Sequence, residues 1–384
     1  MEWIGVPLGA AGTITGMPDV VMFADTMRTP ELRHEVPLQA PDEMIYVERN
    51  GTRQVYASAL EVPRLDELDG GLEAFAFEVL GLDELIAAGL RRDQADPELV
   101  LRACKRVGIE RAAVPRTFPL GIADHLRANG VELVPEGDLF DERRRAKNES
   151  ELAGIKRAAR GSEQAFAAIR SALASGEDVT CEDLKSEVAH AFMAAGVIAP
   201  DPPIVSHGPQ TAVGHEPGHG PIEPGEPVVA DLYPQDPESG CYSDMTRTFC
   251  IGEPSDELRE FHRLCKEVLD AMIPLVRPGI AGAELHRAAC ELFQAAGYPT
   301  QLTKQADEVL DHGFFHALGH GVGLELHEAP LLGRNGAELV VGDVVAIEPG
   351  LYRPGFGGCR LEDLVLVTED GGEVLTDFPH DLEV

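Results

Sequence analysis

The stretch His316-Ala-Leu-Gly-His-Gly-Val-Gly-Leu-Glu-Leu-His-Glu328 places three histidines among glycines and apolar residues. Its three alternating glycines argue against a helix, because each glycine costs about 1 kcal/mol in a helix interior. We therefore expect these histidines to act from looped or extended backbone. The same argument rejects a helical zinc site at His215-Glu-Pro-Gly-His219, although that segment fits the pattern His-Glu-x-x-His. A proline and a glycine fill its middle, and the proline alone costs about 3 kcal/mol in a helix.

Three further segments, the last in two parts, place acidic side chains in or beside apolar, strand-like runs. They contain Asp231 after Val228-Val-Ala, Asp244 in Tyr242-Ser-Asp-Met-Thr-Arg-Thr-Phe249, Glu348 after Val344-Val-Ala-Ile, and Glu362 before Leu364-Val-Leu366. A carboxylate in an apolar strand is costly unless it is paired, hydrogen-bonded or bound to a metal. Any one of these acids alone would more often form a structural ion pair than bind a metal. If all four converge, they raise one another's pKa values, and divalent cations relieve that repulsion. With a histidine they form a mostly oxygen-donor set, which suits Mn²⁺, Co²⁺, Fe²⁺ or Zn²⁺.

The chain divides into two parts with different patterns. In the first part strand-like and helix-like segments alternate, and Asn50-Gly51 between two apolar runs predicts a hairpin. A charged run over 141–150 marks the boundary, so we expect an α/β domain over 1–142 and a second domain over 147–384. The second domain combines helices with short strands in Gly- and Pro-rich sequence, which is typical of an α+β fold. Its helices are predicted over 150–174, 181–195, 256–276 and 282–296, the third of them bent or ended near Pro274. Its strands are predicted over 227–232, 246–251, 344–347 and 361–368.

The charge balance excludes two classes of partner. The chain has 32 basic and 66 acidic residues, a formal net charge of −34 that works against binding nucleic acid or an anionic membrane. The first residues lack the cationic start of a signal peptide, and no apolar run approaches the roughly 18 residues that span a bilayer. The seven cysteines include no Cys-x-x-Cys pair, which disfavours a disulfide framework or a thiolate zinc site. We expect a cytoplasmic protein.

Taken together, the four segments resemble the pita-bread metallopeptidases, which include Xaa-Pro aminopeptidase, prolidase and methionine aminopeptidase. The non-metal enzyme creatinase shares that fold. The matching motifs are Ser-Asp-Met-Thr-Arg-Thr-Phe, His-x-x-Gly-His-Gly-x-Gly-x-x-x-His-Glu and Glu-Pro-Gly-x-Tyr. The resemblance is specific over 147–384 and general before it. It implies an α+β pita-bread (creatinase/aminopeptidase) catalytic domain preceded by a smaller, creatinase-like α/β N-terminal domain.

The resemblance also implies a ligand set for two divalent metal ions per chain, with Mn²⁺ ahead of Co²⁺, Zn²⁺ and Fe²⁺. Asp231 resembles the ligand of one ion alone, and Asp244 and Glu362 resemble the bridging carboxylates. His320 and Glu348 resemble the ligands of the other ion. Glu348 is also implied as the proton acceptor for the water between the metals.

Further residues resemble the family's catalytic and substrate-binding positions. His215 and His327 correspond to the histidines that hold the scissile peptide and its oxyanion. Arg360 corresponds to an arginine that orients the site or binds substrate. His316 and Tyr352 correspond to residues that line the substrate pocket.

Two spacings depart from the family pattern. Asp231 and Asp244 are about two residues further apart than usual, so the insertion over 233–240 should form a longer hairpin tip beside the site. The interval from His215 to Asp231 is about one residue short, which leaves His219 as a rival for the role of His215. These departures remove no ligand, but they leave the shape of the pocket open.

The domain arrangement selects among the family members. The first domain argues against methionine aminopeptidase, which usually has little before its catalytic domain, and the retained ligand types argue against creatinase. The leading function is therefore metal-dependent hydrolysis of the Xaa-Pro bond at the N-terminus of dipeptides or short peptides, by a homodimer as the resemblance implies. Two alternatives stay open: a C–N hydrolase acting on a non-proline substrate at the same metal site, and a binding module on an inactive peptidase fold.

Overall fold

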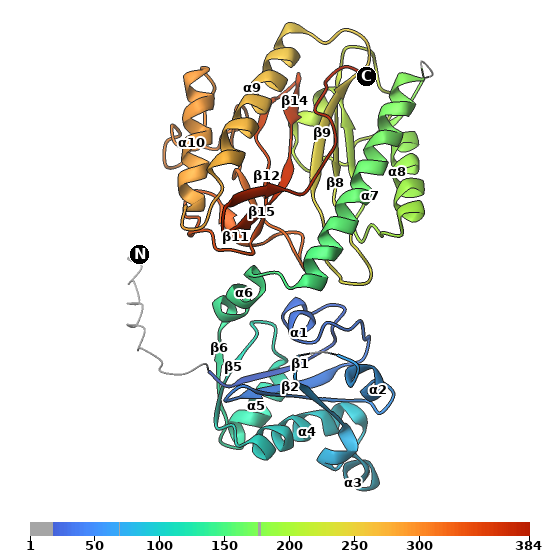
Figure 1. Cartoon of the computed structure of the whole chain (residues 1–384), viewed down its shortest axis with the longest axis vertical. Coiled ribbons are helices and arrows are strands. Elements are labelled where there is room, and N and C mark those ends of the chain that lie inside the picture. The colour runs from blue at the N-terminus through green and yellow to red at the C-terminus, as the bar shows by residue number, and fades with distance from the viewer. Residues whose placement is uncertain (1–17, 69, 176–177) are drawn as a thin grey trace. The chain divides into compact units, whose positions relative to one another are not determined.

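The computed structural model describes residues 18–68, 70–175 and 178–384, and its contacts divide the chain into two compact units, one ending at Phe140 and one beginning at Asp141. The described part of the first unit is built on a six-stranded sheet with the order β4-β3-β2-β1-β5-β6 (Figure 1). Its strands are β1 (Val20–Ala24), β2 (Met44–Arg49), β3 (Thr52–Ala57), β4 (Leu72–Ala76), β5 (Arg111–Val114) and β6 (Glu132–Pro135). The hairpin predicted at Asn50-Gly51 is confirmed, because both residues have positive φ, 51° and 80°, as a tight hairpin turn requires.

Helices cover both faces of this sheet. They are α1 (Pro30–Glu35), α2 (Val62–Leu65), α3 (Leu82–Ala87), α4 (Arg92–Val107) and α5 (Leu120–Ala128), with a 3₁₀ turn at Phe77–Leu80. Helix α6 (Gly137–Arg145) runs across the boundary between the two units. Alternate residues of a strand face opposite sides. Val21 and Phe23 of β1 accordingly pack in a cluster with α4 and α5, whereas Val20 and Met22 pack in a cluster with residues of α1 and α2. The first unit is therefore an α/β layer structure.

The second unit begins with two long helices on a three-stranded antiparallel sheet. These are α7 (Glu149–Ala174) and α8 (Cys181–Ala195), packed on β7 (Ile204–His207), β8 (Pro227–Leu232) and β9 (Met245–Cys250), with a 3₁₀ turn at Gly208–Ala212. Asn148 and Glu151 form a capping box that fixes the start of α7. Both helices were predicted within one residue of these bounds.

The rest of the second unit contains two more helices, a five-stranded sheet and a hairpin. The helices are α9 (Asp256–Met272) and α10 (Gly282–Ala295), with a 3₁₀ turn at Ile273–Leu275, and the hairpin pairs β13 (Gly350–Arg353) with β14 (Gly357–Arg360). The sheet has the order β11 (Glu328–Leu332), β10 (Gly319–Gly321), β12 (Val344–Ile347), β15 (Asp363–Thr368) and β16 (Gly371–Val374). All of its pairings are antiparallel, which confirms the α+β prediction over a parallel βαβ array.

Glycine and proline decide the local structure near the histidines as expected. His215 to His219 lie in a loop, and His316 to His320 run through a bend into β10 without any helical turn. The helix over 256–276, expected to bend or end near Pro274, ends at Met272, and Pro274 stands in the 3₁₀ turn that follows it. Within the described ranges, no helix combines the length and the apolar character that crossing a bilayer would need.

Candidate metal centre

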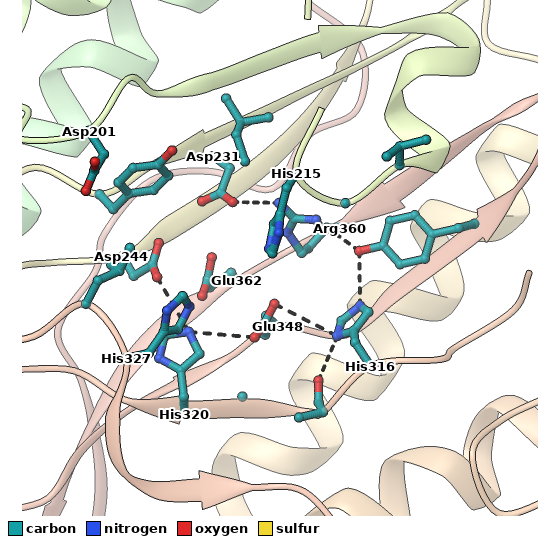
Figure 2. Close-up of a pocket in the computed structure, with 18 of the residues that line it drawn as sticks. Asp201, His215, Asp231, Asp244, His316, His320, His327, Glu348, Arg360 and Glu362 are labelled. Atoms are coloured by element: carbon teal, nitrogen blue, oxygen red, sulfur yellow. Dashed lines mark hydrogen bonds and ion pairs between the residues drawn. The ribbon is translucent and has the colours of Figure 1, made fainter. Parts of the chain in front are cut away.

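The acidic residues singled out in the sequence meet at the ends of strands in the second unit (Figure 2). Asp231 lies in β8, Asp244 directly precedes β9, and His320 lies in β10. Glu348 directly follows β12, and Glu362 lies between β14 and β15. All five line a cavity of about 840 Å³ together with the other predicted site residues, His215, His316, His327, Tyr352 and Arg360. Residues more than 140 positions apart in the sequence thus share one site.

The side-chain atoms of this cluster are close enough to share cations. Oxygens of Asp231, Asp244 and Glu362 lie within 4.8 Å of one another, and so do ligand atoms of His320, Glu348 and Glu362. His320 Nε2 lies 3.6 Å from Asp244 Oδ2 and 3.7 Å from Glu348 Oε1. A third group joins Asp244, His320 and His327, so the geometry also admits His327 as a ligand.

The electrostatics of the cluster fit a bound cation. Asp231 Oδ1 and Asp244 Oδ1 are buried and accept no hydrogen bond from the described residues. Burial, and next the Glu362 carboxylate, raises the pKa of Asp244 well above its ordinary value. Burial also raises the pKa of Glu348 to about 7, with Arg360 opposing and Asp231 adding to the shift. Buried, mutually repelling oxygens without donors are what divalent ions neutralise, so the residues present suit a divalent metal.

Two backbone carbonyl groups fix the tautomers of His320, which is buried, and His316, which is partly buried. His320 Nδ1 lies 3.1 Å from the Gly321 carbonyl oxygen, and His316 Nδ1 lies 2.7 Å from that of Ala317. A carbonyl oxygen only accepts, so each Nδ1 carries the proton and donates it. Burial lowers the pKa of His320 to about 4 and that of His316 to about 3, so both rings are neutral at pH 7. The lone pair on His320 Nε2 therefore faces the carboxylates, the arrangement that a metal ligand requires.

Arg360 organises the other side of the cluster. Its side chain is buried and donates hydrogen bonds to Asp231 Oδ2 at 2.6 Å and to the Tyr352 hydroxyl at 3.0 Å. Its Nε also donates to Thr246 Oγ1 at 3.2 Å, and that hydroxyl donates to Glu362 Oε2 at 2.7 Å. The Tyr352 hydroxyl in turn donates to His316 Nε2 at 3.1 Å, because that nitrogen carries no proton. One guanidinium thus holds one carboxylate directly and a second through Thr246.

The structure separates the two rival histidines. His215 lines the cavity, as does His327. The His219 side chain is 74% exposed, lies 3.8 Å from Glu216, and does not line the cavity. Of these two histidines, His215 is therefore the one that can contact a ligand in the cavity.

The 233–240 insertion lines the cavity through one residue only. Tyr233 lines the cavity, but residues 234–240 do not. The reason is an ion pair, in which Arg157 of α7 donates to both carboxylate oxygens of Asp236 at 2.9 Å and holds the connection against that helix.

Sequence reasoning missed several residues of the site. Thr246 belongs to the Ser-Asp-Met-Thr-Arg-Thr-Phe motif, but its bridging role depends on a contact 116 positions away. Asp201, Tyr233 and Phe315 line the cavity without belonging to any motif singled out above. The alternation of β9, in which Asp244 and Thr246 share a face, was the one available signal for Thr246.

Comparison with known proteins gives consistent matches. The model of metallopeptidase family M24 matches residues 153–369. A "Probable dipeptidase PepE" of Mycobacterium bovis is 32% identical over 280 residues, covering 71% of this chain and 68% of that protein. An "Xaa-Pro dipeptidase" of Lactobacillus delbrueckii subsp. lactis is 33% identical over 243 residues, 62% of this chain and 61% of that protein. The structure of an Xaa-Pro dipeptidase from Bacillus anthracis superposes with a TM-score of 0.78 at 24% identity, covering 96% of this chain and 95% of the other, and it shares the pita-bread fold.

Proposed function

The chain belongs to metallopeptidase family M24, and we propose that it hydrolyses the Xaa-Pro bond at the N-terminus of dipeptides or short peptides. The observation that carries this proposal is the convergence of four carboxylates and a neutral histidine on one cavity, two of the carboxylates having buried oxygens without donors. The relatives named Xaa-Pro dipeptidase support the choice of substrate. Apolar and aromatic side chains in the same cavity, including Phe315 and Leu331, suit a pyrrolidine ring.

We propose that two divalent ions are held by this cluster, Mn²⁺ first among the candidates. Asp231 would hold one ion, His320 and Glu348 the other, and Asp244 and Glu362 would serve both, consistent with the groups of neighbouring ligand atoms. When bound, such ions polarise the scissile carbonyl and lower the pKa of water.

The chain's own residues perform the remaining tasks. Glu348, with 19% of its side chain exposed to the cavity, is placed to accept a proton from water. Burial and then the neighbouring His215 lower the pKa of His327, so a neutral ring at the cavity can donate one N–H to a developing oxyanion. Arg360 keeps Asp231 and Tyr352 in place, while His316 holds the Tyr352 hydroxyl from the other side.

A substrate panel tests the proposal. The enzyme is stripped with a chelator, reloaded with Mn²⁺ or Co²⁺, and assayed with Leu-Pro, Leu-Pro-Gly and the non-proline peptides Leu-Gly and Leu-Gly-Gly. We expect cleavage of the proline substrates and little cleavage of the others. Cleavage confined to non-proline amides would establish the alternative C–N hydrolase. Absence of turnover together with less than one tightly bound ion per chain would revive the inactive binding module.

We further propose that the protein is a cytoplasmic homodimer. All seven cysteines are unpaired and buried, which is consistent with a reducing compartment. The dimer rests on the resemblance to the Xaa-Pro peptidases. Light scattering on the purified protein measures the oligomeric state, and cell fractionation measures the location.

A further inference from the structure

Asp201 is a cavity-lining carboxylate that the proposed chemistry does not use. Its side chain is exposed, and no hydrogen bond or ion pair joins it to any other described residue. Figure 2 shows it beyond Asp231 and Asp244, on the side away from Glu348 and His316. It belongs to none of the groups whose ligand atoms lie within 4.8 Å of one another. Asp201 therefore keeps its negative charge available at the edge of the cavity.

The segment that presents Asp201 is held in place. The Tyr233 hydroxyl donates to the carbonyl oxygen of Pro202 at 2.6 Å. Ile198 and Gln235 exchange two backbone hydrogen bonds, of 2.9 and 2.8 Å. The Arg157–Asp236 ion pair anchors the same connection to α7. The insertion after β8 thus contributes Tyr233 to the cavity and also fixes the segment that carries Asp201.

The two ends of the cavity differ in chemistry. At one end, the Tyr352 hydroxyl contacts both His316 and the guanidinium of Arg360. Arg360 is the only Lys or Arg among the described residues that line the cavity. That guanidinium already donates to three side chains. The end marked by Asp201 has no cation of its own. A cationic group of a substrate would therefore find its partner at this end.

The position of Asp201 distinguishes between two cationic groups of a peptide. The α-ammonium group is only two bonds from the scissile carbonyl carbon, so it must lie close to the carboxylate cluster itself. The side chain of a first-position arginine or lysine extends several bonds further. Phe315, which suits the proline ring, packs on Tyr352 at the other end of the cavity, so this longer side chain is left the end marked by Asp201. We propose that Asp201 selects substrates with arginine or lysine before the proline. This inference rests on the proposed function, because it assumes that the scissile bond lies over the cluster.

The test compares kcat/KM for Arg-Pro, Lys-Pro, Leu-Pro and Glu-Pro at low and high salt. The wild type should prefer Arg-Pro and Lys-Pro, and the preference should weaken as salt screens the charges. Asp201→Asn should lower the Arg-Pro to Leu-Pro ratio about fivefold, the range of a solvent-accessible ion pair. Asp201→Lys should shift the preference toward Glu-Pro. Glu253→Gln, which neutralises an exposed acid outside the cavity, should leave the ratio unchanged.

Three results have different meanings. If Asp201→Asn lowers kcat/KM equally for all four peptides, Asp201 binds the α-ammonium group and this inference is overturned. If the wild type cleaves Leu-Pro without any preference for a cationic first residue, the inference is overturned while the proposed function stands. If no Xaa-Pro peptide is cleaved by metal-loaded enzyme, the proposed function itself is wrong, and this inference falls with it.

Discussion

Glu362 and Asp363 are adjacent in the chain and equally buried, at 2% exposure each, yet their surroundings are opposite. Asp363 accepts hydrogen bonds from Arg247 Nη2, Thr376 Oγ1 and His380 Nε2, all at 2.8 Å. Although burial raises its pKa, the hydrogen bond from His380 and the charge of Arg247 outweigh it, and the net pKa is lowered. Burial raises the pKa of Glu362, and the charges of Asp231 and Glu348 raise it further.

The difference separates a structural carboxylate from a functional one. A buried carboxylate whose oxygens accept a full set of hydrogen bonds stabilises the fold. A buried carboxylate surrounded by other carboxylates can still bind a cationic ligand. The partners of Asp363 also contact Glu362, because Arg247 Nη1 donates to the backbone carbonyl oxygen of Glu362 at 2.7 Å. The ion-paired groups around Asp363 thus support the backbone at Glu362.

The largest effect is expected from Glu362→Gln, which removes a proposed ligand and one of the repelling charges. Activity should fall about a thousandfold, since a metal supplies several kcal/mol to the transition state. The metal-free protein should melt at a higher temperature than the wild type, because repulsion is relieved. Kinetics and thermal unfolding in chelator measure both, with Glu373→Gln on an exposed ion pair as the control. Wild-type metal content and activity in the variant would contradict the assignment of Glu362.

Asp363→Asn should instead destabilise the metal-free protein. It leaves the buried Arg247 without its carboxylate, which should cost about 3 kcal/mol of unfolding free energy. Urea unfolding of metal-free protein measures the loss. Asp381→Asn, in an exposed pair with Arg170, should change stability by less than about 0.5 kcal/mol. Equal stabilities for Glu362→Gln and Asp363→Asn would contradict the assignment of Asp363 as a structural carboxylate and Glu362 as a functional one.

Arg360→Lys should weaken metal binding about 10- to 100-fold, the usual cost of losing a group that orients a ligand. Lysine keeps the charge but lacks the fork that reaches Asp231, Tyr352 and Thr246 together. Titration of chelated enzyme with Mn²⁺ measures the affinity. Arg353→Lys, at an exposed arginine, is the matched control. An unchanged affinity would show that Arg360 does not position the ligands.

Asp236→Asn should produce the smallest effect, about 1–2 kcal/mol of stability at neutral pH. Burial raises the pKa of Asp236, but Arg157 and Ser239 outweigh it, so the folded-state pKa is lowered. Its contribution is therefore present above about pH 4 and is lost as pH falls through the folded-state pKa. Urea unfolding of wild type and variant should converge at acid pH, and Arg157→Met should remove the same pH-dependent difference. If wild type and Asp236→Asn still differ in unfolding free energy at acid pH, the ion pair of Asp236 with Arg157 is not the cause of the difference.

Local patterns predicted the elements of the second unit and the placement of the acidic residues, because apolar periodicity and glycine content act over a few residues. They could not distinguish Glu362 from Asp363, since the partners of Asp363 are contributed by β9 and by the segment after β16. They also could not predict that the insertion packs on α7, because Arg157 lies 79 positions before Asp236. Asp201 carries no signal in the sequence, because its significance comes only from the cavity that it lines.

The tautomers of His316 and His320 are set by carbonyl groups of the residues that follow them, not by neighbouring side chains. No substitution can delete a main-chain oxygen. The positions of these two protons are therefore little affected by most single substitutions. The side chain of Ala317 can change without reversing them, whereas a side chain at Gly321 would clash with the backbone oxygen of Ala329. Evolution can remodel the cavity around these imidazoles while the direction in which each presents its lone pair stays the same.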